Sequence, residues 1–104
     1  MATGILGQSS PAALNNTTVY TVPAATTAVA TISIANTTTT PSLVRVAIAA
    51  SGTPSASEYI EYDTLIDANG VFERSGIVMN ATKAVVVYAT SAGLSVSVYG
   101  YEEA

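Results

Sequence analysis

Two carboxylates, Glu61 and Asp63, lie two residues apart in the stretch YIEYD and are the best candidates for catalytic chemistry in the sequence. A pair of carboxylates across a cleft can hydrolyse a glycosidic bond, one as acid and the other as base or nucleophile. On a strand of an antiparallel sheet both would point outward, with Ile60 and Tyr62 pointing inward. We expect both carboxylates to be solvated there, and the pair does not predict an active site.

Other catalytic chemistry lacks the residue types it needs. The chain has no His, Cys or Trp, and a Ser or Thr nucleophile needs a base beside it. Asp63, Asp67 and Asn69 could offer oxygens to calcium, but DTLIDANG lacks the alternating ligands and distant Glu of a calcium loop. The Asn-Gly pair is typical of a hairpin turn. We therefore predict no enzyme activity, no catalytic residue, no metal site and no cofactor.

Tyrosines are the remaining candidates, and two of them share one face of the last predicted strand. Tyr99 and Tyr101 alternate there with Leu94, Val96 and Val98 on the opposite face. They are either an exposed aromatic platform for a sugar or a protein partner, or the second packing face of a central strand. The absence of Trp weakens the sugar alternative. Both residues stay candidate partner-binding residues.

Seven alternating stretches of β-branched and aromatic residues, separated by turn residues, predict the elements that position these side chains. No stretch has a convincing helical stripe. The spacing predicts an all-β fold, an antiparallel β-sandwich of about seven strands that is either Ig-like or jelly-roll-like. Val86 and Val96 are expected in its core. The predicted strands are residues 19–22, 27–35, 43–50, 58–66, 71–79, 83–90 and 94–102.

The segment before these strands, residues 1–16, does not fit the sandwich. It is rich in Gly, Ser and Ala and carries no charge. It is either a disordered terminus or an extended arm that becomes ordered on a neighbouring subunit. Disordered tails usually carry charge and few large apolar residues, which favours the arm, with Ile5, Leu6, Gln8 and Leu14 as its contacts. We therefore predict an N-terminal arm, 1–16, and a single sandwich domain, 17–104.

Charge is scarce and unevenly distributed. Only 10% of the 104 residues are charged, the net charge is −4, and the first charged side chain is Arg45; ordinary domains have about 25%. Three cations cannot neutralise the phosphates of a nucleic acid, so we predict no nucleic-acid binding. No run of about 20 apolar residues is present, so we predict no membrane span. The first residues do not have the pattern of a secretory leader. Because charges normally protect sheet edges, flat uncharged Thr-rich edges predict association, and we expect a homo-oligomer covered by neighbours.

Five stretches spread along the chain carry a resemblance that extends over nearly its whole length: GILGQSSPAALNNTTVYTVPA, RVAI, YIEYDTLI, VVVYAT and LSVSVYGYE. Together they resemble a group of small tailed-bacteriophage virion proteins. This chain differs from that group in its TTTT loop and its scarce charge. The resemblance implies a non-enzymatic structural protein, most favourably a capsid decoration (cement) protein on the outside of the shell that binds the major capsid protein or other virion proteins. Particle symmetry favours a trimer. The alternatives are a neck-, tail- or fibre-associated component and a host-glycan-binding module that uses Tyr99 and Tyr101.

Overall fold

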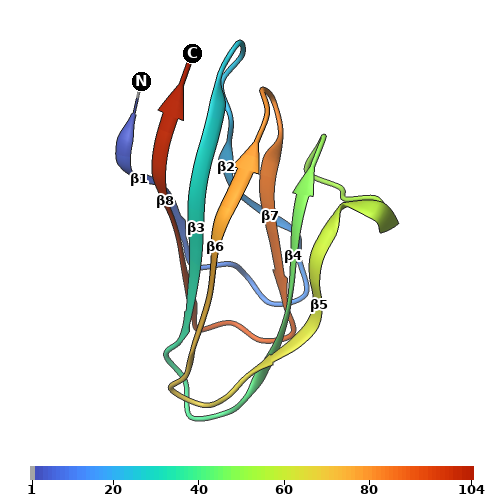
Figure 1. Ribbon diagram of the computed structural model, residues 1–104. Helices are drawn as coiled ribbons and strands as arrows, with labels where there is room; N and C mark the ends of the chain where they lie inside the picture. Colours follow the sequence, from blue (N-terminus) through green and yellow to red (C-terminus); the bar gives the residue numbers. More distant parts are fainter. Residues whose placement is uncertain (1) are drawn as a thin grey trace.

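A computed structural model describes residues 2–104 and shows two four-stranded antiparallel sheets packed face to face (Figure 1). Sheet A has the order β1-β8-β3-β6 and sheet B the order β2-β7-β4-β5. The single helical element of these residues is the 3-10 helix η1 (Ala56–Glu58), and no helix among them has the length and apolarity to cross a membrane. The strands are β1 (Thr3–Ser9), β2 (Thr17–Thr21), β3 (Thr27–Asn36), β4 (Ser42–Ala49), β5 (Tyr59–Ile66), β6 (Val71–Met79), β7 (Ala84–Ala89) and β8 (Leu94–Glu103).

The strand order is that of one long hairpin folded back on itself. Strand β4 pairs with β5 at the tip of this hairpin, and β3 with β6, β2 with β7 and β1 with β8 follow toward the chain ends. When the paired ribbon wraps, β3 meets β8 in sheet A and β4 meets β7 in sheet B. This is the order of an eight-stranded jelly roll. Of the two sandwich types that the sequence predicts, the structure therefore has the jelly roll, with both termini at one end (Figure 1).

The eighth strand lies in the segment that we expected to be an arm. Residues 3–9 form β1, which pairs with β8 of the same chain along the edge of sheet A. The pairing brings Gly7 so close to β2 that a Cβ there would lie 2.3 Å from the carbonyl oxygen of Val19. In this chain residues 3–9 are therefore a strand of the sandwich. The other seven strands lie where the alternation predicts them, with ends shifted by at most two residues.

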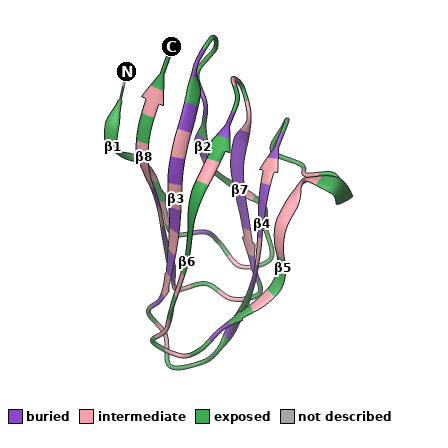
Figure 2. Ribbon diagram, in the orientation of Figure 1, coloured by how far each residue is buried: buried purple, intermediate pink, exposed green. Residues whose placement is uncertain are grey.

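The main core lies between the two sheets, where one face of every inner strand is buried. In β8, Leu94, Val96 and Val98 are buried and Ser95 and Tyr101 are exposed, as the alternation predicts. Figure 2 shows buried residues along β3 and β7, and exposed residues along β1 and β6. The core is therefore deepest under the two middle strands of each sheet and shallow at the edges.

All four edge strands are irregular. Each edge pair has a register shift: β1 with β8, β2 with β7, β6 with β3, and β5 with β4. The central pairs, β3 with β8 and β4 with β7, run without one. An extra residue in one strand bends it and disturbs the row of free backbone groups, which protects an edge against pairing with another chain. The expectation of flat edges is therefore wrong, because bulges supply the protection that charges do not.

Strand β5 shows how bulges change which side chains face the core. It has two register shifts against β4, and Asp63 adopts a positive φ of 53° within it. As a result Tyr62, which alternation places inward, is exposed on the outer face of sheet B, and Ile60 packs partly against the core. A period-two pattern fails here because each extra residue reverses the faces beyond it.

A second apolar cluster lies on the outer face of sheet B. Ala47, Ala49, Ala84 and Val86 are buried there, with Tyr59 packed against them. The β4–β5 connection, residues 50–58, folds back over them: a Cβ at Gly52 would lie 3.5 Å from the hydroxyl oxygen of Thr18 in β2, on the far side of β7. Val86 is thus buried, as expected, but beneath this loop and not between the sheets.

Candidate interaction surfaces

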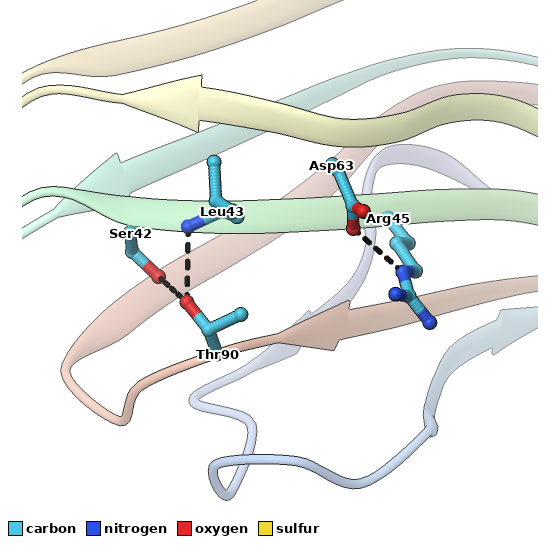
Figure 3. A network of polar contacts seen from close by, with 5 residues as sticks. All are labelled: Ser42, Leu43, Arg45, Asp63 and Thr90. Carbon is cyan, nitrogen blue, oxygen red and sulfur yellow. Dashed lines mark hydrogen bonds and ion pairs between the residues drawn. The ribbon is translucent and has the colours of Figure 1, made fainter.

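The two candidate catalytic carboxylates are each paired with a different arginine. Asp63 Oδ1 accepts a hydrogen bond from Arg45 Nε at 2.7 Å (Figure 3), and Glu61 accepts one from Arg74 of β6 and a second from Thr64. Arg74 also donates to the carbonyl oxygen of Ile60 and thereby links the edges of the two sheets. The carboxylates form two separate ion pairs along the β5–β6 side of the sandwich.

An arginine and three tyrosines form a stacked cluster on the outer face of sheet B. The Arg45 guanidinium lies 4.2 Å from the ring centre of Tyr62 and 4.7 Å from that of Tyr88. The Tyr59 ring meets Tyr62 edge-on, with 5.0 Å between centroids. The hydrogen bond to Asp63 raises the pKa of Arg45. Because the guanidinium of Arg45 in β4 contacts a ring from β5 and a ring from β7, this cluster serves to hold β7, β4 and β5 together.

The predicted turn at residues 67–70 forms as expected. Gly70 N donates to Asp67 O at 2.9 Å, Asn69 has a φ of 56°, and its amide donates to Thr38 O. Over residues 2–104 no group of three or more acidic side chains could hold a metal ion, and no pocket is found. Because the Asn69 backbone N–H donates to Thr38 O, the turn packs against the Thr-rich β3–β4 loop, at the end of the sandwich opposite the chain termini.

That Thr-rich loop is organised by one buried amide. Asn36 Nδ2 donates to the carbonyl oxygens of Thr40 and Ile66, and its Oδ1 accepts from the amide and hydroxyl groups of Thr38. All of these hydrogen bonds lie within a buried or half-buried site. The TTTT stretch is therefore an ordered loop.

Tyr99 and Tyr101 lie on the outer face of sheet A, so they are not a second packing face within this chain. Tyr101 is 43% exposed, and Tyr99 is half-buried. The Tyr99 hydroxyl donates to Glu73 Oε2 at 2.9 Å, and this hydrogen bond raises the pKa of Tyr99. Both rings face outward from the middle of a sheet, where a partner surface could cover them.

The four candidate residues of the N-terminal segment separate into three environments. Ile5 lies beside Tyr99 on the outer face of sheet A, and Gln8 Nε2 donates to Ser97 Oγ on that face. Leu6 is the bulged residue and packs against the core. Leu14 is exposed in the β1–β2 connection, where its amide donates to Ala89 O of sheet B. The structure therefore brings Ile5 and Gln8 together with the two tyrosines and places Leu6 and Leu14 elsewhere.

One carboxylate ties the start of the chain to the sandwich. Glu102 of β8 accepts hydrogen bonds from the Tyr20 hydroxyl of β2 and from the Ala2 amide, the latter at 3.1 Å. Its pKa is lowered, chiefly by the hydrogen bond from Tyr20, and burial raises the pKa of Tyr20. The N-terminal strand is thus held to both sheets.

Apolar side chains from all four strands lie in two adjacent rows on the outer face of sheet A. The register places Val78 beside Val29, Val29 beside Tyr101, and Tyr99 beside Ile5. Ile5 and Val78 are 58% and 67% exposed. We call this surface the sheet A face and define it by Ile5, Gln8, Val29, Val78, Tyr99 and Tyr101. The alternation of β3 and β6 could have identified Val29 and Val78, but only their pairing with β8 places them beside the tyrosines.

Comparison with protein-family models, with curated proteins and with solved structures finds no match to the chain.

Proposed function

We propose that the chain is a non-enzymatic structural protein of a bacteriophage virion, most favourably a capsid decoration protein that binds the outside of the shell and reinforces it. The observation that carries the proposal is the sheet A face, an outward sheet surface with exposed apolar side chains, beside which the carboxylate of Glu73 accepts a hydrogen bond from Tyr99. Exposed apolar patches of this kind mark surfaces that bind other proteins. A jelly roll is common among viral capsid domains, although a fold alone does not determine function.

The mechanism is repeated weak contact. A decoration protein meets the shell at many equivalent positions, so modest contacts add up when copies also hold one another. The proposal includes contacts with the major capsid protein or other virion proteins, and a homo-oligomer, for which a three-fold position of the shell favours a trimer. The lack of a pocket over residues 2–104 agrees with binding through a surface.

A copy count tests the proposal and its nearest alternative. Quantitative mass spectrometry of purified particles would measure this chain against the major coat protein. A ratio near one per coat subunit supports decoration of the shell. A few copies per particle support a neck, tail or fibre position instead, and absence from the particle contradicts both.

Glycan binding is the second candidate, favoured by the adjacent outward rings of Tyr99 and Tyr101. A glycan array probed with the purified chain is the direct test. A signal that disappears on replacing both tyrosines by Ala supports this candidate, and a wild-type chain without any signal removes it.

A further inference from the structure

We propose that the sheet A face is a contact between two copies of this chain, which meet through the same face about a two-fold axis. The chain covers one apolar cluster on the outer face of sheet B with its own residues 50–58 and leaves Leu43, Tyr62 and Leu65 of that face exposed. On sheet A, Ile5, Val78 and Tyr101 are exposed. The contact rests on the association between copies in the proposed function, but it replaces the trimer that a three-fold position favours with a two-fold pair. It does not require a particle, so it can be tested on the purified chain alone.

Association through the face is favoured over association through an edge. Both edges of sheet A carry a bulge, β1 at Leu6 and β6 beside Gly76, and each interrupts the free row of backbone groups. Continuous strand pairing with another chain is therefore disfavoured at either edge. The inner strands β8 and β3 pair without a register shift and present a regular surface between those edges.

The face is complementary to itself. A two-fold axis that runs along the strands, between two sheet A faces, reverses the strand order of the second copy. Strand β8 then lies over β3 of the second copy, and β1 lies over its β6. Val29 meets Tyr101 of the second copy because these two residues share one row across the sheet. Ile5 meets the bulge at Gly76, where a side chain is absent and even an added Cβ would touch nothing within 4 Å.

The charges of the face are also complementary under this axis. Glu73, Ser33, Ser97 and Gln8 form one row across the four strands. The reversed order therefore places Glu73 opposite Gln8 of the second copy, and an amide N–H of Gln8 can donate to that carboxylate. Glu103 lies opposite Thr27 by the same argument. No carboxylate meets another, although each chain has a net charge of −4.

The size of the face predicts a weak dimer. Four strands at about 4.8 Å spacing and about seven residues of strand length give roughly 500 Å² per copy. Stable complexes bury about 800 Å² per partner. We therefore expect association at tens of micromolar or higher concentration, which is a useful strength for copies that are also held by a shell.

Sedimentation equilibrium of the purified chain, with one matched pair of variants, tests the contact. Tyr101→Glu places a carboxylate in the middle of the sheet A face, and Tyr62→Glu makes the same change on the outer face of sheet B, where Tyr62 is 57% exposed. We expect a reversible dimer for the wild type and for Tyr62→Glu, and a monomer for Tyr101→Glu. Circular dichroism should show that both variants stay folded.

A double substitution tests the axis itself. Gln8→Glu places a carboxylate opposite Glu73 of the second copy and should weaken the dimer about tenfold at low salt, less at high salt. Adding Glu73→Gln returns a carboxylate–amide pair and should restore dimerisation to within about threefold of the wild type. Within one chain the two residues lie three strands apart, roughly 14 Å, so rescue requires contact between copies.

Three results would overturn the contact: a chain that stays monomeric at about 1 mM, a dimer that survives Tyr101→Glu but not Tyr62→Glu, or a trimer. A monomer whose occupancy on particles falls with Tyr101→Glu would instead assign the face to another virion protein. These outcomes are independent of the copy count, because a chain absent from particles can still dimerise and a monomer can still decorate a shell.

Discussion

The outer faces of the two sheets both carry apolar side chains, and they differ in whether a loop of the same chain covers them. Sheet B has Ala47, Ala49, Ala84 and Val86 on its outer face and covers them with residues 50–58 of the same chain. Sheet A has outward apolar side chains in two adjacent rows and leaves Ile5, Val78 and Tyr101 exposed. The chain can therefore cover a face when it has a loop to do so. Sheet B still leaves Leu43, Tyr62 and Leu65 exposed, so the loop covers only part of its outer face. On sheet A we propose that a second copy provides the cover.

The largest expected effect is the loss of folding stability when a carboxylate is placed in an apolar cluster. This loss should differ between the core between the sheets and the cluster under the loop. Val96→Asp buries an unpaired carboxylate between the sheets and should cost several kcal/mol, a large part of the roughly 5–15 kcal/mol of a domain. Val86→Asp should cost less, because displacing residues 50–58 lets water reach the carboxylate. Urea denaturation of both variants measures the difference. Equal losses of stability in the two variants would mean that residues 50–58 cannot be displaced without unfolding the sandwich.

A smaller effect is expected from a glycine that lets two strands of sheet A approach closely. A Cβ at Gly100 would lie 2.0 Å from the carbonyl oxygen of Val29 in the neighbouring strand. Gly100→Ala must therefore push β8 from β3 and should cost about 1–3 kcal/mol. Gly76→Ala is the control, because its Cβ has open space and only the positive φ of 72° opposes it. Denaturation midpoints in the reverse order would show that β8 and β3 can separate freely.

The smallest expected effect concerns the loop that covers sheet B and depends on pH. Glu58 accepts hydrogen bonds from the Ser55 and Ala50 amides, and these lower its pKa. A carboxylate with a lowered pKa stabilises the folded loop above the pKa of an ordinary glutamate and loses this contribution as the pH falls through the lowered value. Hydrogen-exchange protection of the Ser55 and Ala50 amides should fall as the pH drops below the pKa of an ordinary glutamate, about 4.3. Glu58→Gln should show weaker protection without this pH dependence, and protection that is constant in the wild type would contradict the role of Glu58.

Local pattern was sufficient to predict most of the strands. Val and Ile alternate with polar residues in β3, β4 and β8, and this pattern indicates strands wherever they pair. Strand β1 was missed because TGILGQS has two glycines and little alternation. What makes it a strand is pairing with β8 at the other end of the chain, which local pattern does not contain. The run AVVVYA in β7 did carry a signal for burial on both faces, which the second cluster explains.

The candidate surface was predictable only in part. Alternation places Tyr99 and Tyr101 on one face, and the structure confirms this. Placing Ile5 and Gln8 beside them required the register of β1 against β8, and the bulge that sends Leu6 inward is not evident from residue types. Likewise, two bulges in β5 reversed the expected direction of Tyr62. Irregular edges limited the prediction, since one extra residue changes the face of every later side chain.

The nesting of the strands also sets the order in which the chain can fold as it is made. Gln8 and Ser97, partners across β1 and β8, are 89 residues apart. At about 5–20 residues per second, β1 is synthesised roughly 4–18 s before β8. The outermost pair therefore closes last, and pairing over such separations is slow. During this interval the uncharged first strands are open to other nascent chains, so the yield of native protein should depend on how fast and at what temperature it is produced.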